Sequence, residues 1–379
     1  MIRYLRTAPA ATHKHPIVLL RLDLNIAARE LRNSVRLSRA VSTLLFLRRK
    51  GCRVVIISHR GRPSSQEQRT KKAAADSSLK PLAGALSRRL GTKVIFDSSF
   101  DLSVLPVRVR ALPPGGILLL ENIRLWPEEE KNNASFARKL AALGDLYVND
   151  AFAVSHRAHA SVDAITRYLP SYAGLELEKE ICALDAVMKK PKQPLVVVLG
   201  GVKISDKIGV LKNFWRRADA ILTGGGVANT ILAFRGASIG QSVFEPGARG
   251  VLAKYLDAKK LCAPVDTVTT AKGIFDIGPR TAVKYAAILR SAKTIIWNGP
   301  MGYIEKKPYQ KGTLAVGVAC TRARAFSVVG GGETTSFLFE KKLAGKLSFV
   351  STGGGAMLDY LAGEKLPGVQ ALKRPVRSL

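Results

Sequence analysis

The sequence predicts an α/β protein of two lobes, each built on a mostly parallel, doubly wound sheet flanked by helices. Short apolar runs without polar alternation recur along the chain between helical patterns, as expected for buried parallel strands. In the second half, four of these runs each meet a glycine cluster before the next helical pattern begins. The length of 379 residues, 47% of them hydrophobic, suffices for two buried cores.

The composition argues against a membrane protein, a secreted protein and a protein held by disulfides or zinc. No apolar run approaches the roughly 20 residues of a membrane-spanning helix, and the first residues lack the apolar core of a signal peptide, so we expect a cytoplasmic protein. The four cysteines are far apart in sequence, which favours buried free thiols over disulfides or a zinc site.

The net charge of +32 is the unusual feature of the composition. Residues 1–170 hold 29 Lys and Arg against 13 Asp and Glu, and residues 171–379 hold 31 against 15, so each half carries +16. A nucleic-acid reader more often concentrates its charge in a stripe or an arm. The even division predicts a generally basic surface that attracts anionic substrates and binds no specific nucleic acid.

In the first half, basic residues follow buried strands. We predict strands at 17–25, 53–57, 93–96, 116–120 and 146–149, a helix at 81–90, a surface loop at 64–80 and a solvated helix start at Glu128–Glu130. If the strands are parallel, their carboxyl ends lie along one edge, where open α/β sheets bind ligands. The basic residues expected to converge there are Arg21, Arg36, His59, Arg62, Arg124, His156, Arg157 and His159. Such a set suits phosphate and carboxylate groups.

The stretch from Pro194 to Asn213 predicts a polyphosphate seat. The apolar strand 195–199 stops at two glycines, and a helix begins at about Ser205. A helix start offers free N–H groups and the positive end of the helix dipole. Lys203 and Lys207 add two ammonium groups beside it. An ordinary strand-to-helix turn with surface lysines would give the same local pattern.

The remaining elements of the second half repeat this arrangement. A helix over 176–190 is predicted to bridge the halves, and strands are predicted at 219–223, 264–270, 295–297, 326–329 and 348–350. Their glycine clusters indicate that backbone approaches a ligand from several sides. Neither G-x-x-x-x-G-K-[ST] nor G-x-G-x-x-G is present, so neither a Walker A loop nor a dinucleotide fingerprint explains them.

These segments together resemble the phosphoglycerate kinase family over nearly the whole chain. The matching motifs are RLDLN, SHRGRP, LLLENIRLWPEEEKNN, YVNDAFAVSHRAHAS, LGGVKISDKIGV, GGGVANT, DIGP, WNGPMGYIE, VGGGETTS and VSTGGGAMLDYLAGEKLPGV. The resemblance implies two Rossmann-like lobes: residues 1–173 bind 3-phosphoglycerate, with 366–379 returning to this lobe, and residues 191–365 bind the nucleotide. Residues 174–190 would form the interdomain helix, with a hinge that closes the lobes.

The resemblance further implies reversible phosphoryl transfer from 1,3-bisphosphoglycerate to ADP, giving 3-phosphoglycerate and ATP, a glycolytic reaction of a magnesium-dependent, monomeric enzyme. The residues that match the family's phosphoglycerate site are Asp23, Asn25, Arg36, His59, Arg62, Arg124, His156, Arg157 and His159. Those that match its nucleotide site are Gly201, Lys203, Lys207, Gly225, Gly226, Asn298, Pro300, Glu305, Gly332, Glu333 and Thr334. The catalytic set implied is Arg36, Lys203, Lys207, Gly354 and Gly355, with Glu333 as the magnesium ligand.

Three features depart from the family pattern. Glu333 stands where the family has Asp, which bears on metal geometry. Arg60 replaces a Leu and is predicted to add a cation near the substrate lobe. The chain is also short and strongly basic for the family. Two alternatives therefore stay open: a nucleic-acid-binding protein with the kinase fold, and a homologue that has lost activity through the change at Glu333.

Overall fold

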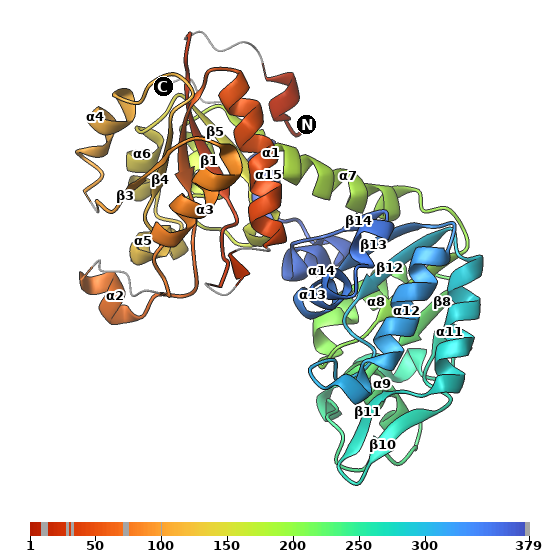
Figure 1. The fold of residues 1–379 in the computed structure, drawn as a ribbon. Helices are drawn as coiled ribbons and strands as arrows, with labels where there is room; N and C mark the ends of the chain where they lie inside the picture. Colours follow the sequence, from red (N-terminus) through yellow and green to blue (C-terminus); the bar gives the residue numbers. More distant parts are fainter. Residues whose placement is uncertain (9–13, 28–29, 32–33, 71–75, 100, 376–379) are drawn as a thin grey trace. The chain divides into compact units, whose positions relative to one another are not determined.

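The computed structural model describes residues 1–8, 14–27, 30–31, 34–70, 76–99 and 101–375. The chain folds as two compact units, drawn in Figure 1. The first unit combines Met1–Ile181 with the segment that begins at Lys365, and the second is Cys182–Glu364. The boundary between them falls inside helix α7 (Leu175–Lys189).

The first unit is built on six parallel strands in the order β3-β4-β2-β1-β5-β6. Their bounds are β1 Ile17–Leu22, β2 Arg53–Ile57, β3 Val94–Asp97, β4 Ile117–Leu120, β5 Leu146–Asp150 and β6 Ser171–Ala173. Every residue of β1 is buried, as the apolar run predicts for a central strand. The strand ends at Leu22, so the polar residues up to Asn25 lie in the loop after it.

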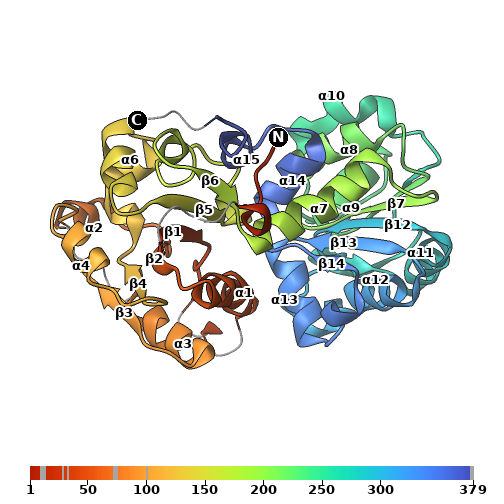
Figure 2. The same ribbon diagram turned by 90° about the horizontal axis from the view of Figure 1, so that it is seen from above.

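Helices cover both faces of this sheet. They are α1 Val35–Arg49, α2 Ser65–Thr70, α3 Lys80–Leu90, α4 Leu105–Arg110, α5 Pro127–Glu130 and α6 Ala134–Ala141. Leu37 and Leu44 of α1 and Leu86 of α3 share one buried cluster with Val18 and Leu20 of β1. In Figure 2, α1 and α3 lie on one face of the sheet and α6 lies on the other.

The predicted loop over 64–80 contains a helix, α2, so that prediction is wrong in part. The Ser64 hydroxyl accepts from the Glu67 N–H, and the Glu67 carboxylate accepts from the Ser64 N–H at 2.7 Å. This reciprocal pair is a capping box, which the S-x-x-E spacing encodes without any apolar periodicity. Residues 71–75 of the stretch lie outside the described residues.

The second unit is built on six parallel strands in the order β14-β13-β12-β7-β8-β9. Their bounds are β7 Leu195–Leu199, β8 Ala220–Thr223, β9 Leu261–Cys262, β12 Thr294–Asn298, β13 Phe326–Gly330 and β14 Phe349–Val350. The helices are α8 Ile208–Phe214, α9 Gly225–Phe234, α10 Arg249–Leu252, α11 Pro279–Ser291, α12 Lys311–Arg322, α13 Gly332–Glu340 and α14 Gly354–Ala362. Figure 2 shows α8 and α14 on one face of this sheet and α12 on the other.

The run predicted as a strand over 264–270 does not join the main sheet. It contains β10 (Thr267–Thr270), which pairs antiparallel with β11 (Gly273–Ile277) in a separate hairpin. The strand that completes the main sheet is the two-residue β9, which is too short for a periodicity signal. All four cysteines are among the described residues and none forms a disulfide there, as predicted. Cys182 is exposed and Cys262 is only partly buried, contrary to the prediction of buried thiols.

Polar contacts hold the segment that begins at Lys365 on the first unit. The N–H of Gly368, in helix α15 (Pro367–Ala371), donates to the Ser155 carbonyl at 2.8 Å. Arg374 forms an ion pair with Asp163 at 2.7 Å. The end of the chain thereby packs against the loop that follows β5.

Asp150, the last residue of β5, caps the start of α7. Its Oδ1 accepts from the N–H groups of Glu176 and Leu177 at 2.8 and 3.0 Å. A carboxylate at this position satisfies two N–H groups of the first turn and complements the helix dipole. The sheet of the first unit and the bridging helix are therefore joined by one buried side chain.

We expect Asp150→Ala to lower the free energy of unfolding by about 1–3 kcal/mol, because two buried N–H groups lose their acceptor. Urea unfolding at neutral pH measures the change. The matched control is Glu178→Ala, which removes a carboxylate from the same helical turn. Because Glu178 makes an exposed ion pair with Arg6, its loss is expected to cost well under about 1 kcal/mol. Equal losses in the two variants would contradict the capping role.

Candidate active site

The buried guanidinium of Arg21, in β1, is at the centre of the basic cluster in the first unit. Its side chain has no solvent exposure. Nε donates to the Ser161 hydroxyl at 2.9 Å, Nη1 to the Leu22 carbonyl at 2.6 Å, and Nη2 to Nδ1 of His59 at 3.2 Å. Because an arginine only donates, His59 Nδ1 is the acceptor, and a neutral His59 ring carries its proton on Nε2.

The histidines of the cluster are held neutral by their surroundings. Burial, followed by the charges of Arg21 and other arginines, lowers the pKa of His59 well below its usual value. Burial and the charge of Arg124 lower the pKa of His159 to about 4. Both rings are therefore uncharged at neutral pH and act as hydrogen-bonding groups among arginines.

Glu129 supplies a buried counter-charge to the cluster. The prediction of a solvated helix start is therefore confirmed for Glu128 and Glu130, which are exposed, and wrong for Glu129. Its side chain has no exposure, and its two carboxylate oxygens accept from the N–H and the hydroxyl of Ser161 at 2.8 and 2.6 Å. Burial raises the pKa of Glu129, while the charge of Arg21 opposes that rise. Ser161 thus connects the carboxylate to the guanidinium, a pairing that the run of three glutamates does not reveal.

The loop after β1 ties further predicted residues to this edge. Arg36 lies 3.4 Å from the Asp23 carboxylate and donates to the Asn25 carbonyl at 2.7 Å. The Asn25 side chain accepts from the Gly61 N–H, and Arg124 donates to the Gly61 carbonyl, each at 2.8 Å. These contacts connect the ends of three strands, β1, β2 and β4.

The structure brings most of the predicted first-unit site together. The charges that act on His59 and His159 come from Arg21, Arg36, Arg124, Arg157 and His156. Arg157 also donates to His156 at 3.3 Å. Arg62 is exposed and lies next to Gly61 in sequence. The predicted convergence of basic groups at one sheet edge therefore matches the geometry of these residues.

Arg60 lies in the first unit, but its side chain does not join this cluster. The side chain is 3% exposed and turns inward, where Nε donates to the Ile26 carbonyl and Nη1 to the Ser78 carbonyl at 2.8 and 2.9 Å. Arg60 therefore fastens neighbouring loops to one another.

In the second unit, three glycine turns interlock at the carboxyl edge of the sheet. The N–H of Gly201 donates to the Pro300 carbonyl and that of Gly225 to the Met301 carbonyl, both at 2.8 Å. Gly299 has a φ of +92°, and a Cβ placed on it would lie 2.2 Å from the Gly200 carbonyl oxygen. The glycines here allow backbone to approach backbone, in addition to any approach of a ligand.

Other glycines leave backbone open. A Cβ on Gly332 would meet no atom within 4 Å, and one on Gly354 would meet its nearest neighbours only at 3.7 Å. These residues begin α13 and α14, where N–H groups lack helical partners. Nearby, Asn298 Nδ2 and Thr334 Oγ1 are buried without a hydrogen-bond partner among the described residues. Unpaired buried polar atoms beside open helix starts fit a bound polar ligand.

Lys207 is the buried lysine of the glycine stretch, and its charge interacts with that of Glu333 in α13. It is 6% exposed, and its ammonium group donates to the Lys203 carbonyl at 3.3 Å. Burial lowers its pKa, and the carboxylates of Asp206, Glu245 and Glu333 oppose that effect. Glu333 is exposed in the first turn of α13. The charge of Lys207, the predicted phosphate-binding lysine, therefore interacts with that of Glu333, the predicted metal ligand.

Glu305 is exposed, beyond an aromatic cluster that the sequence analysis missed. Phe275 of β11 stacks on Tyr309 with centroids 4.8 Å apart and contacts Tyr303 at 6.2 Å. The N–H of Tyr303 donates to the Phe275 carbonyl at 2.7 Å. This cluster fixes the loop that follows β12 and carries Glu305. Its residues are scattered along the sequence, so no local pattern indicates it.

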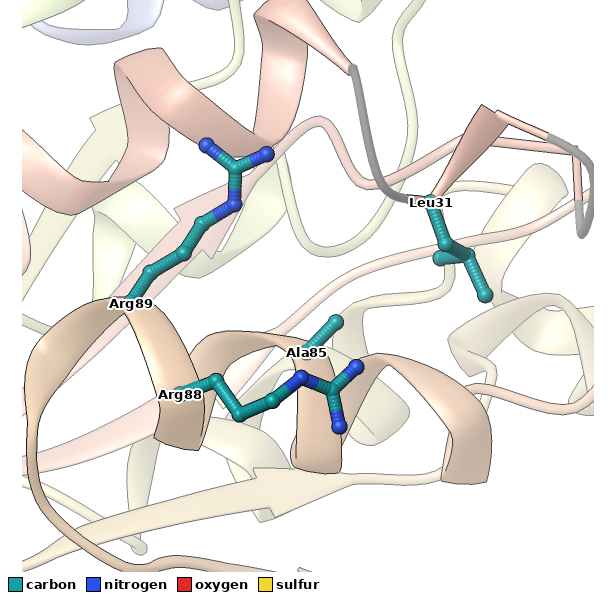
Figure 3. Close-up of a pocket in the computed structure, with 4 residues that line it drawn as sticks. All are labelled: Leu31, Ala85, Arg88 and Arg89. Atoms are coloured by element: carbon teal, nitrogen blue, oxygen red, sulfur yellow. The ribbon is translucent and has the colours of Figure 1, made fainter.

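A separate pocket in the first unit, shown in Figure 3, is lined by Leu31, Ala85, Arg88 and Arg89 and has a volume of about 520 Å³. No predicted site residue lines it. Arg89 also donates to the Ser38 hydroxyl at 2.6 Å. The predicted site therefore rests on the two strand edges and not on this pocket.

Among the residues that the structure describes, no three His, Cys, Asp or Glu side chains gather in a metal-binding group. Glu333 nevertheless offers one carboxylate beside open N–H groups and the unpaired Thr334 hydroxyl. Magnesium is often held by one or two carboxylates together with substrate phosphates and waters. The residues present fit that mode of binding.

Comparison with known proteins decides the family. The family model described as phosphoglycerate kinase matches residues 10–364. The chain belongs to the phosphoglycerate kinase family. It is 40% identical to the phosphoglycerate kinase of Thermomicrobium roseum over 94% of this chain and 96% of that one. It is 38% identical to the phosphoglycerate kinase of Herpetosiphon aurantiacus, over 93% of this chain and 95% of that one.

Solved structures of the family agree. The phosphoglycerate kinase of Coxiella burnetii superimposes with a TM-score of 0.83 at 34% identity, covering 98% of this chain and 99% of that one. The enzyme of Pyrococcus horikoshii gives 0.83 at 31% identity, with 98% of each chain covered. The predicted family, the two-lobed α/β fold and the activity of a glycolytic phosphotransferase are thus confirmed. A search of the described helices finds none with the length and apolarity to cross a membrane.

The buried His159 predicts acid-sensitive stability. Its pKa in the folded protein is about 4, below the 6.5 of a free histidine. The unfolded chain therefore binds the proton more readily, and the free energy of unfolding falls as the pH drops from about 6.5 to about 4. We expect His159→Gln to lose less stability over this interval than the parent, measured by urea unfolding at successive pH values. Parallel curves for the two proteins would show that His159 does not contribute.

Proposed function

We propose that the basic edge of the first unit binds 3-phosphoglycerate or 1,3-bisphosphoglycerate. The observation that carries this is the density of positive groups: Arg21, Arg36, Arg124 and Arg157 act together on one neutral histidine, His59. Guanidinium groups hold phosphate and carboxylate through paired hydrogen bonds. The groups proposed to contact the ligand are Asp23, Asn25, Arg36, His59, Arg62, Arg124, His156, Arg157 and His159, with Arg21 holding His59 in position.

The glycine-rich edge of the second unit is proposed to bind ADP or ATP. The open helix starts at Gly332 and Gly354 and the unpaired polar atoms of Asn298 and Thr334 support phosphate binding there. The remaining proposed contacts are Gly201, Lys203, Lys207, Gly225, Gly226, Pro300, Glu305 and Glu333. Because Lys207 is buried, its ammonium group would interact strongly with the phosphate oxygens of a nucleotide bound there.

The proposed chemistry needs positioning and charge neutralisation and no protein nucleophile. A β-phosphate oxygen of ADP attacks the acyl phosphorus of 1,3-bisphosphoglycerate, and the bond to the carboxyl oxygen breaks, leaving 3-phosphoglycerate. The attacking oxygen is already anionic, so no general base is required. Arg36, Lys207 and the N–H groups at Gly354 and Gly355 would stabilise the equatorial oxygens of the moving group.

Magnesium would be held by Glu333 together with nucleotide phosphates. The ion would neutralise phosphate charge. Glu keeps the charge and oxygen ligands of the Asp it replaces, and its exposed side chain at the start of α13 has room for one more methylene. Since the acyl phosphate and the nucleotide are proposed to bind different units, transfer also requires a closing motion that excludes water.

A coupled assay of ATP consumption with 3-phosphoglycerate tests the proposal directly. Turnover that depends on both substrates and on magnesium is expected. Folded protein that binds either substrate without turnover would indicate instead the inactive homologue suggested by the change at Glu333.

We predict that Arg62→Ala and Arg157→Ala each weaken 3-phosphoglycerate binding by about 1.5–3 kcal/mol and leave ADP affinity nearly unchanged, because each removes a charge-assisted contact from the first unit alone. Isothermal titration calorimetry measures both affinities. Lys139→Ala, which removes an exposed cation from α6, is the control and should change neither. Equal losses for the two ligands would contradict the assignment of one substrate to each unit.

We predict that Glu333→Gln raises the magnesium concentration needed for half-maximal rate and lowers kcat at least tenfold, since it removes the one carboxylate offered to the ion. Glu333→Asp, the matched variant, keeps the charge and should retain activity. Steady-state rates over a magnesium titration measure both. A Gln variant as active as the parent at every magnesium concentration would exclude Glu333 as the ligand.

A further inference from the structure

The amino edge of the second sheet carries an unpaired row of positive charge. All strands of this sheet are parallel, so the turns that enter them lie along one edge, opposite the glycine-rich edge. Eight exposed cations lie in the turns, or in the last helical turn, before β7, β8, β9, β12 and β13. They are Lys190, Lys192, Arg216, Lys259, Arg290, Lys293, Arg322 and Arg324.

Backbone contacts show that these turns are neighbours in space. The Phe326 N–H donates to the Lys293 carbonyl at 2.9 Å, and the Thr294 hydroxyl donates to the Lys192 carbonyl at 2.7 Å. On the other side of β7, the Gln193 side chain donates to the Arg217 carbonyl at 3.2 Å. The cations therefore follow the strand order without interruption.

Local charge does not neutralise this row. None of the eight cations forms an ion pair among the residues that the structure describes. The turns before the five strands contain two carboxylates, Asp219 and Asp257. Asp219 accepts from the Leu195 N–H at 2.7 Å. Cations at helix ends complement the helix dipole, which accounts for Arg290 and Arg322. Lys192, Lys293 and Arg324 lie beyond the helix ends, where the helix dipole contributes little stabilisation to a cation.

We propose that this edge binds the phosphate backbone of nucleic acid without regard to sequence. Five adjacent strands at about 4.8 Å spacing make a row about 19 Å long. One strand of a duplex places a phosphate about every 3.4 Å along its axis, so the row spans about five phosphates. A single file of charges matches a linear polyanion better than a plane of lipid headgroups. Among the described residues, the only exposed large apolar side chain beside these turns is that of Phe326, the first residue of β13, which is too little for an amphipathic membrane contact.

The proposal is independent of the kinase activity. Strand β7 has five residues at about 3.3 Å each, so the basic edge lies roughly 16 Å from the glycine-rich edge. A bound polyanion would leave the proposed nucleotide site open. The binding is nonspecific, which agrees with the expectation that no specific nucleic acid is recognised.

Fluorescence anisotropy of a labelled duplex of about 20 base pairs, longer than the row, tests the proposal. The full-length protein is titrated at about 50, 100 and 200 mM NaCl with magnesium, once in the presence and once in the absence of ADP. The test variant combines Lys192→Gln, Arg216→Gln, Lys293→Gln and Arg322→Gln. The control combines Lys272→Gln, Arg280→Gln, Lys284→Gln and Lys311→Gln, which removes four exposed cations from other places in the same unit.

The parent is expected to bind with a micromolar Kd at the lowest salt. The test variant should bind at least about tenfold more weakly, with a salt slope shallower by about 3.6, since each lost phosphate contact removes about 0.9. The control should stay within about threefold of the parent. Kinase activity should be unchanged in the test variant, which shows that it folds.

Three results would overturn the proposal. The first is equal weakening in the test and control variants, which would mean a general charge effect. The second is displacement of the duplex by ADP, which would place the duplex in the nucleotide site. The third is binding to anionic phosphatidylserine vesicles, lost in the test variant, without binding to the duplex, which would make the edge a membrane contact.

Discussion

The hydrogen bond from the buried guanidinium of Arg21 to His59 is the contact on which the first unit's site depends. It fixes the tautomer of the histidine, and the same guanidinium reaches Ser161 and, through it, Glu129. A buried charge without such partners would be costly. The network gives the arginines nearer the ligand a rigid positive support, and it keeps the charge in place when the ligand is absent.

The proposed nucleotide site of the second unit also depends on groups held rigidly in place, but most of these are backbone groups. Its turns must hold polyphosphate with backbone, so they need both close approach and open N–H groups. Interlocked glycines such as Gly299 provide the rigidity, and unobstructed ones such as Gly332 and Gly354 provide the open backbone. Buried Lys207 adds one charge whose position is fixed by Lys203. Positioned dipoles and charges are what phosphoryl transfer requires of a protein.

The features that could be predicted from the sequence are those that follow from parallel strand topology. Buried apolar runs gave the sheets, and their carboxyl ends gave the meeting of Arg36, His59, Arg124 and Arg157. Prediction failed where partners are distant in sequence. A run of three glutamates shows nothing of Ser161, so the burial of Glu129 was not predicted. Nor did the sequence indicate that carbonyls of two loops hold the Arg60 side chain inward. Short elements such as β9 and α2 also gave no periodic signal.

The parallel topology also explains why the net charges of the two sequence halves did not reveal how the cations are arranged on the second sheet. An equal division of +32 between residues 1–170 and 171–379 counts residues along the chain, whereas parallel strands sort them by sheet edge. Residues that follow the strands lie at the carboxyl edge, where the ligand sites are proposed. Residues that precede the strands lie at the opposite, amino edge. In the second unit the preceding residues include Lys192, Lys293 and Arg324. Net charge per segment therefore cannot distinguish a uniformly basic surface from a single row of cations, and only strand order can.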